Sequence, residues 1–199
     1  MEPLPFSQAC ENNKTFILEI LQRHLTSHGR VLEIGSGTGQ HAEYFAARFP
    51  DLTWLCTDLA ENLPGLNQRI LQAALPNLPT AVELDVTRHD WPAGKVRAVF
   101  SANTLHIMPA SAVKDFFPGV ARQLETDGLL LVYGPFKYQG EFTTESNARF
   151  DQWLKARDPA SGIRDFETLI GYAKEVGLEL LEDNAMPANN QLLVWRRTG

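Results

Sequence analysis

The sequence has little of what marks several common classes of protein. Its two cysteines, Cys10 and Cys56, form no C-x-x-C pair, so neither a disulfide framework nor a zinc site is indicated, and a reducing cytoplasm is expected. The longest unbroken apolar run, residues 129–133, is much too short to cross a bilayer. No basic residue precedes Lys14, which argues against a secretion signal. These absences predict a soluble cytoplasmic protein with no metal site and no membrane partner.

Positive charge is also scarce. There are 18 Lys and Arg residues against 24 Asp and Glu, the net charge is −6, and the basic residues cluster only at Arg196-Arg197. A protein that binds duplex nucleic acid usually carries a basic stripe, so nucleic acid is not expected as a partner. With 199 residues and 44% hydrophobic content, the chain can bury one core. We therefore predict a single domain over residues 1–199.

A glycine-rich junction at residues 31–39, VLEIGSGTG, is the most informative feature that is present. A short apolar β-type run is followed by Gly35, Gly37 and Gly39, and helical periodicity begins at Ala42. Glycine allows a strand to reverse into a helix within a few residues, and lets a ligand approach the main chain and the N–H groups that start the helix. The pattern predicts a strand, a turn and a helix that cradle a nucleotide-type ligand; a turn without a ligand is the simpler alternative.

The spacing of these glycines separates two kinds of cofactor. The dinucleotide fingerprint G-x-G-x-x-G would place its third glycine at position 40, which is Gln40. The run is instead G-x-G-x-G, with the acidic Glu33 two residues before it, and so it resembles the first motif of the class I S-adenosylmethionine (SAM) dependent methyltransferases. The resemblance implies that the cofactor site includes Glu33, Gly35, Ser36, Gly37 and Gly39.

An acidic residue follows the second predicted strand, residues 52–57. Asp58 stands at its carboxyl end, 19 residues beyond Gly39. In a doubly wound sheet, an acidic side chain at this position lies beside the first loop, where it can accept both hydroxyls of a ribose. Asp58 could instead, or in addition, cap the next helix. We expect the ribose role, with Leu59 beside it in the cofactor site.

The third predicted strand, residues 80–84, ends in Asp85-Val86. The methyltransferase resemblance implies that the Asp85 carboxylate meets the adenine amino group and that the N–H of Val86 meets a ring nitrogen. The alternative for Asp85 is a solvated carboxylate at the end of a strand.

Two polar residues follow the fourth predicted strand, residues 96–101. Parallel strands present their ligand at their carboxyl ends, so Asn103 is expected at the cofactor and His106 near its reacting end. An unperturbed histidine has a pKa near 6.5, which makes His106 the candidate general base. A histidine that hydrogen-bonds near the cofactor, or caps the next helix, is the alternative. The segment is not the Asp/Asn-Pro-Pro-aromatic run in which base-directed amino-methyltransferases resemble one another, so nucleobase methylation is not favoured.

The regular alternation of strands and helices changes after the fifth predicted strand, residues 129–133. Residues 134–164 mix aromatic residues with Lys and Arg and contain one predicted helix, residues 146–156. They are expected to form a substrate lid over the sheet edge; a small hydrophobic cluster packed on that edge is the alternative. A helix and two last strands, residues 178–181 and 191–196, complete the chain.

From end to end the chain resembles a class I methyltransferase domain. The resemblance implies an α/β fold in three layers, with a Rossmann-like seven-stranded sheet, mostly parallel with an antiparallel terminal hairpin, an N-terminal helix and a lid insertion after strand 5. The chain is more narrowly similar to an uncharacterised methyltransferase-like family catalogued as a domain of unknown function. The blocks that carry this similarity are residues 6–14, 101–106, 133–136, 146–148, 162–165 and 186–190.

The resemblance implies SAM as the cofactor and leaves the methyl acceptor and the oligomeric state open. The compact chain and the lack of a basic patch favour methyl transfer to a small molecule. A catalytically silent SAM-binding module that acts through a partner is an alternative. A nicotinamide-dependent oxidoreductase is another, against which Gln40 argues.

Overall fold

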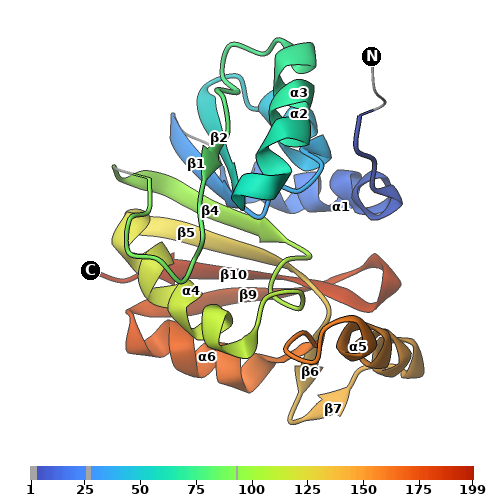
Figure 1. Cartoon of the computed structure of the whole chain (residues 1–199). Helices are drawn as coiled ribbons and strands as arrows, with labels where there is room; N and C mark the ends of the chain where they lie inside the picture. The colour runs from blue at the N-terminus through green and yellow to red at the C-terminus, as the bar shows by residue number, and fades with distance from the viewer. Residues whose placement is uncertain (1–3, 26–27, 93) are drawn as a thin grey trace.

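A seven-stranded sheet forms the centre of the protein. The computed structural model describes residues 4–25, 28–92 and 94–199, and the strand order is β3-β2-β1-β4-β5-β10-β9 (Figure 1). The strands are β1 Gly29–Ile34, β2 Leu52–Asp58, β3 Val82–Glu83, β4 Val96–Ala102, β5 Leu124–Gly134, β9 Leu178–Met186 and β10 Asn190–Arg197. The strands from β3 to β5 pair in parallel, and β10 runs antiparallel to both of its neighbours. The predicted sheet, with its antiparallel terminal hairpin, is confirmed.

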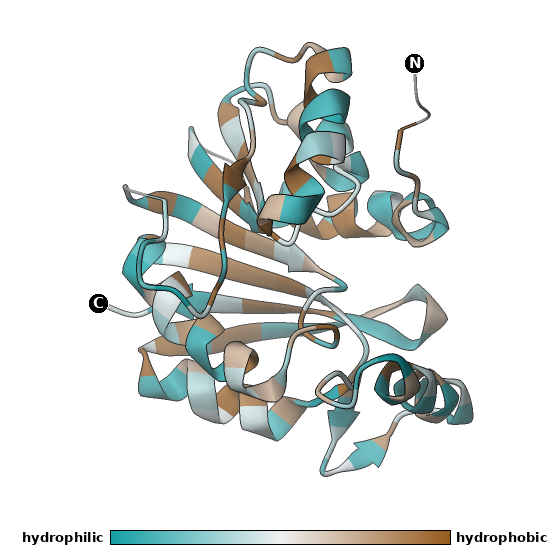
Figure 2. Cartoon of the chain, in the orientation of Figure 1, coloured by the Kyte–Doolittle hydropathy of each residue, from teal (hydrophilic) through white to brown (hydrophobic). Residues whose placement is uncertain are grey.

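Helices pack on both faces of this sheet and complete three layers. The helices are α1 Gln8–His24, α2 Gln40–Ala46, α3 Leu63–Ala73, α4 Ala110–Gln123 and α6 Phe166–Glu175. Alternate residues of a strand point to opposite faces. Val31 and Leu131 accordingly lie in the core shared with α1, α2 and α3, whereas Leu32 and Leu130 lie in the core shared with α4 and α6. Figure 2 shows the apolar residues concentrated in the strands between the two helical layers.

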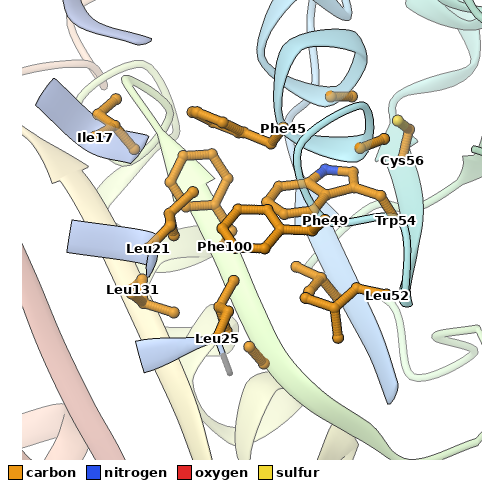
Figure 3. Packing of buried hydrophobic residues seen from close by; sticks show 14 of the residues in the cluster. Ile17, Leu21, Leu25, Phe45, Phe49, Leu52, Trp54, Cys56, Phe100 and Leu131 are labelled. Atoms are coloured by element: carbon orange, nitrogen blue, oxygen red, sulfur yellow. The ribbon is translucent and has the colours of Figure 1, made fainter. Parts of the chain in front are cut away.

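The core on the α1 face is built around three aromatic rings. Phe45 of α2, Trp54 of β2 and Phe100 of β4 are fully buried, with ring centroids 5.4 to 5.9 Å apart (Figure 3). Ile17 and Leu21 of α1 cover them. Tilted and edge-to-face contacts of this kind add to the free energy gained from burying the rings. The core therefore joins the N-terminal helix to the strands on either side of the glycine-rich loop.

The third strand is shorter than predicted. The sequence predicts residues 80–84, but β3 contains only Val82 and Glu83, which pair with Thr57 and Asp58 at the end of β2. It lies at the sheet edge and has one neighbouring strand. The two terminal strands, in contrast, are longer than predicted because they pair with each other along most of their length, and β10 pairs with β5 as well. Partner strands set these lengths more than local propensity does.

The segment after β5 has its own secondary structure. It contains β6 Phe136–Tyr138, β7 Glu141–Phe142, α5 Glu145–Arg157 and β8 Arg164–Asp165, and β7, β6 and β8 form a second, small sheet. The predicted helix is confirmed as α5, which starts at an N-cap on Thr144. Two short 3-10 helices, Ala60–Asn62 and Pro187–Asn189, complete the fold. Within the described ranges, none of the helices combines the length and apolar character that a membrane crossing needs.

Two helical glycines give a test of the packing. A Cβ on Gly119 of α4 would lie 2.1 Å from Cζ2 of Trp91, whereas a Cβ on Gly171 of α6 would meet no atom within 4 Å. Alanine in an open helix position is favoured over glycine by about 1 kcal/mol. We expect G171A to raise the free energy of unfolding by up to about 1 kcal/mol, and G119A to lower it by about 1–3 kcal/mol through the displaced indole. Urea unfolding of both variants measures this, and stabilisation by G119A would contradict the Trp91 packing.

Candidate cofactor and acceptor site

The glycine-rich loop between β1 and α2 is fastened to the end of β2. The backbone N–H groups of Gly35 and Ser36 both donate to the carbonyl of Thr57, at 3.0 Å, and the N–H of Gly39 donates to the carbonyl of Ser36 at 2.9 Å. The loop glycines have φ values of +73°, +52° and +74°, which residues with a Cβ rarely adopt. The predicted strand, turn and helix are present, and the turn has one defined backbone path.

The three glycines serve different purposes. A Cβ on Gly35 would lie 2.5 Å from Thr104 Cγ2, and one on Gly39 would lie 2.7 Å from Leu66 Cδ1, so both are needed for close packing. A Cβ on Gly37 would meet no atom within 4 Å, so the backbone here faces open space. Next to it the Ser36 hydroxyl is buried beside Glu33 and Cys56, and its interaction with them opposes the rise of their pKa values. An open main chain at the start of a helix fits a polar ligand lying across the loop.

Asp58 is the carboxylate nearest to this open face. One of its oxygens accepts the N–H of Gly37 at 2.6 Å, and the other accepts the N–H of Leu59 at 2.8 Å and the side-chain amide of Asn62 at 2.7 Å. Asp58 is not the N-cap of either helix that follows: the N-cap of the 3-10 turn is Leu59 and that of α3 is Asn62, and neither has a side-chain capping bond. A carboxylate has about four acceptor positions in all, so capacity remains for a ribose hydroxyl. The ribose role stays a prediction.

Asp85 and Val86 follow β3, next to the end of β2, and the N–H of Leu84 donates to the carbonyl of Asp58 at 2.9 Å. Asp85 is half-buried, and Thr87 donates its N–H and its hydroxyl to one carboxylate oxygen at 2.9 and 2.8 Å. These bonds lower the pKa of Asp85. Leu59 exposes 42% of its surface at the same sheet edge, an apolar contact available to a flat ring.

His106 lies beyond β4, on the other side of the loop. Its side chain is buried, and its ring meets that of Phe150 edge-on, with centroids 5.3 Å apart. Burial, and to a smaller extent the positive charge of Arg164, lowers the pKa of His106 to about 4. The imidazole is therefore neutral at pH 7 and able to accept a proton. Asn103, also assigned to the site, adopts a left-handed φ of +56°, which asparagine tolerates better than most residues.

The insertion after β5 is hydrogen-bonded to the segment that carries His106. The N–H of Gly162 donates to the carbonyl of His106 at 2.9 Å, and the Ser161 hydroxyl donates to the carbonyl of Ile107 at 2.8 Å. Nε of Arg164 donates to the carbonyl of Leu105 at 2.9 Å. In Figure 1, α5 lies below the carboxyl edge of the sheet and α1 lies above it. Two segments outside the βα units thus flank the candidate site.

Gln40 has a function that the sequence pattern did not reveal. Its buried amide accepts the N–H of Ser7 at 2.5 Å and donates to the carbonyl of Ser7 at 3.3 Å. Arg69 of α3 donates to the carbonyls of Pro5 and Thr38, at 2.7 and 2.6 Å. The N-terminal segment is therefore fastened over the glycine loop. Sequence reasoning identified Gln40 only as a missing glycine, because no local pattern indicates a partner 33 residues away.

A cluster of buried polar side chains lies beneath α1. Nε2 of His41 lies 2.6 Å from Oδ1 of Asn13, and Nδ1 lies 3.9 Å from the thiol of Cys10. Burial lowers the pKa of His41 to about 4. Burial raises the pKa of Tyr133, and hydrogen bonds with Asn13 and Asn190 oppose this rise. Asn13 is thus buried and turned inward, although it lies in the first turns of α1.

Glu33 differs from the other predicted site residues because its carboxyl group is directed into the core. Its side chain is 2% exposed and accepts the indole N–H of Trp54 at 2.7 Å. Burial raises the pKa of Glu33 to about 8, although the bond from Trp54 opposes the shift. Glu33 is therefore mostly protonated at neutral pH, and its visible role is to support the strand beneath the loop.

The raised pKa of Glu33 predicts a pH-dependent cost in stability. Below pH 4.5 the residue is protonated in both the folded and the unfolded chain; as the pH rises to about 8, only the unfolded chain ionises it, so folding loses stability. Glu33→Gln keeps an acceptor for Trp54 but has no proton to lose. The free energy of unfolding of the variant, relative to that of the wild type, should therefore increase by on the order of a few kcal/mol over this pH range. Urea unfolding at several pH values tests it, with the exposed Glu19→Gln as control. A constant difference between E33Q and the wild type would refute the shift.

Neither of two surface hollows lies at this edge. One lies between α6 and β9 and includes Lys174 and Trp195, and the other follows α3 and includes Leu71. The candidate site is identified instead by the groups that the strand ends bring together: the loop, Asp58, Asp85, Asn103 and His106. The strand order places these groups at the ends of four adjacent strands.

Comparison with solved structures supports the fold. The chain is similar to an O-methyltransferase family protein from Burkholderia thailandensis, with 16% identity and a TM-score of 0.82 over 94% of this chain and 56% of that one. It is also similar to the S-adenosylmethionine-dependent methyltransferase SibL, with 20% identity and a TM-score of 0.78 over 96% and 56%. A putative methyltransferase from Bacillus halodurans matches at 14% identity and a TM-score of 0.72, over 93% of this chain and all of that one.

The chain therefore has a methyltransferase-like fold and spans 56% of the length of the first two of these proteins. At the level of sequence, the model of one family, described as a protein of unknown function (DUF938), matches residues 4–197. That match covers nearly the whole chain and agrees with the narrower resemblance seen in its sequence blocks, and the protein belongs to the DUF938 family.

Proposed function

We propose that this protein is a SAM-dependent methyltransferase that acts on a small molecule. The observation that carries the proposal is the open backbone at Gly37, bordered by the Asp58 carboxylate. An adenosine has two adjacent ribose hydroxyls and a flat base, which match a carboxylate beside a glycine loop and an apolar edge next to it. The SAM dependence of SibL, on the same fold, supports this choice of cofactor.

Each predicted residue has a specific task in this proposal. Asp58 accepts a ribose hydroxyl at its remaining acceptor position, the exposed side chain of Leu59 covers one face of the adenine, and Asp85 with the N–H of Val86 binds its polar edge. Asn103 lies toward the methionine end of the cofactor. The residues of the glycine loop provide backbone contacts to the cofactor: Gly35, Ser36, Gly37 and Gly39. Glu33 supports this loop from below through Trp54 and makes no contact of its own with the cofactor.

SAM, when bound, supplies an electrophilic methyl group on a sulfonium. The task of the chain is to hold an acceptor atom in line with that group, at about 3 Å, in a site that excludes water. An acceptor that keeps its proton at neutral pH needs a base. The ring of His106 is unprotonated at this pH and can take up that proton, and its lowered pKa makes it a weaker base than a free histidine. The net charge of −6 and the insertion packed beside His106 favour a small molecule over nucleic acid.

Loss of the Asp58 carboxylate should weaken binding of the cofactor. Asp58→Asn keeps an acceptor for the N–H of Gly37 but replaces the other carboxylate oxygen with an amino donor and removes the charge, and we expect a loss of about 1–3 kcal/mol, roughly 5- to 150-fold in Kd. Calorimetric titration with S-adenosylhomocysteine, SAM and NAD measures it. Asp51→Asn, an exposed carboxylate just before the opposite end of β2, is the matched control. Unchanged affinity in folded D58N would remove the ribose assignment, and binding of NAD alone would favour the oxidoreductase.

Replacing His106 should separate catalysis from binding. We expect His106→Gln to bind S-adenosylhomocysteine as the wild type does and to transfer labelled methyl groups to a metabolite extract about 10²- to 10⁴-fold more slowly. In the wild type, the rate should rise with pH through about 4, where the buried imidazole loses its proton. The exposed His28→Gln is the control. Full activity of H106Q would exclude His106 as base, and cofactor binding without transfer to any extract would favour the silent module.

A further inference from the structure

The helix of the insertion, α5, has its polar and apolar sides reversed. Its buried residues are Asn147, Asp151 and Leu154, of which two are polar. Trp153, the largest side chain in the helix, is 51% exposed, and Phe150 is only half-buried. A surface helix ordinarily buries its aromatic residues and exposes its amides and carboxylates. In Figure 2, α5 is correspondingly dominated by hydrophilic residues.

The buried polar residues are what attach α5 to the rest of the protein. The Asn147 amide donates to the carbonyl of Asn189, in the turn between β9 and β10, at 3.0 Å. The Asp151 carboxylate accepts the N–H of Ile163 at 2.8 Å and pairs with Lys155 at 2.6 Å. Buried polar groups with such partners are satisfied. The helix is therefore held in place without burial of Trp153, and the exposure of this indole needs another reason.

The aromatic residues of α5 form a continuous row with His106. The Phe150 ring meets the His106 ring edge-on at 5.3 Å and an interplanar angle of 74°, and lies nearly parallel to the Trp153 ring at 5.8 Å and 17°. The row leads from the proposed base, at the carboxyl edge of the sheet, to an exposed indole. Aromatic faces and edges of this kind recognise another flat ring through offset and edge-to-face contacts.

Several cations lie beside this row. Arg164 donates to backbone carbonyls, including those of Leu105 and Ala160, and Lys155 is bound by Asp151. The Arg157 guanidinium lies over the Trp153 ring, 4.7 Å from its centroid, and forms no ion pair with the described residues. The rings therefore favour a flat ring in the ligand, and the charges beside them do not exclude a polar or anionic substituent on it.

We propose that Phe150 and Trp153 select the methyl acceptor, and that the acceptor is a flat aromatic molecule with a hydroxyl or amino group that reaches His106. This inference rests on the proposed function and deepens it by naming the substrate class. Methyl transfer to such a hydroxyl forms a carbon–oxygen bond as the sulfur–carbon bond of SAM breaks; the hydroxyl proton passes to His106, and S-adenosylhomocysteine is left.

The test compares a flat ring system with its saturated equivalent on protein loaded with S-adenosylhomocysteine. We expect 2-naphthol to bind at least about tenfold more tightly than decahydro-2-naphthol, in calorimetry and in quenching of tryptophan fluorescence. Trp153 is half-exposed while Trp54, Trp91 and Trp195 are buried, so the quenching reports mainly on Trp153. Equal binding of the two probes, or no binding of 2-naphthol, would overturn the proposal.

Variants locate the binding. Trp153→Leu should weaken the binding of 2-naphthol about three- to tenfold, and Trp153→Phe should retain most of the affinity because it keeps an aromatic ring. Phe150→Leu should weaken it similarly, with its thermal melt recorded beside that of the wild type. Phe16→Leu, an aromatic residue of α1 that is 42% exposed, is the matched control and should change nothing. If Phe16→Leu weakens 2-naphthol binding as much as Trp153→Leu does, or if Trp153→Leu leaves the calorimetric affinity unchanged, the aromatic row is not the binding site.

Two further measurements distinguish the ways of failing. Binding of S-adenosylhomocysteine is titrated separately in every variant. If the wild type does not bind it, the proposed function is wrong. If the wild type binds it but does not discriminate between the two probes, only the proposed acceptor class is wrong. Sedimentation equilibrium tests whether a second copy of the chain covers α5. A dimer that dissociates in W153L would reassign the exposed aromatic face to self-association and overturn the proposal.

Discussion

The bonds accepted by the Asp58 carboxylate connect more of the candidate site than any other single group does. They join the glycine loop, the end of β2 and the 3-10 turn that leads into α3. A buried carboxylate is stable there because several N–H donors converge on it, and hydrogen bonds to a charged group are stronger than neutral ones. The loop in turn can follow its path only because Gly35 and Gly39 have no Cβ. One carboxylate and two absent side chains thus leave the backbone at Gly37 open.

The rest of the structure supports this edge from two sides. On one side Gln40 and Arg69 fasten the N-terminal segment to the loop, and the core of Phe45, Trp54 and Phe100 fixes the helix that follows. On the other side Arg164, with Ser161 and Gly162 beside it, fastens the insertion to the turn that carries His106. The two attachments are independent of each other. The cofactor half and the acceptor half of the proposed site can therefore be altered separately.

The protein also keeps several ionisable groups neutral in its interior. His41 and His106 have pKa values lowered to about 4, whereas that of Glu33 is raised to about 8. The two histidines make stability rise with pH between about 4 and 6.5, because the unfolded chain binds protons there and the folded chain does not. Glu33 has the opposite effect between about 4.5 and 8.

The sequence by itself determined the order of strands and helices, the glycine loop and the acidic residue after β2, because hydrophobic periodicity and glycine spacing are local properties. It also indicated that residues 134–164 break the pattern. Tertiary structure alone decided that β3 is only two residues long, that Gln40 fastens the N-terminus, that Asn13 faces inward and Glu33 is buried against Trp54, and that Trp153 is exposed on α5. The physical reason is that each of these outcomes depends on partners far away in the chain, and the 2-fold and 3.6-fold periods of a strand or helix carry no information about them.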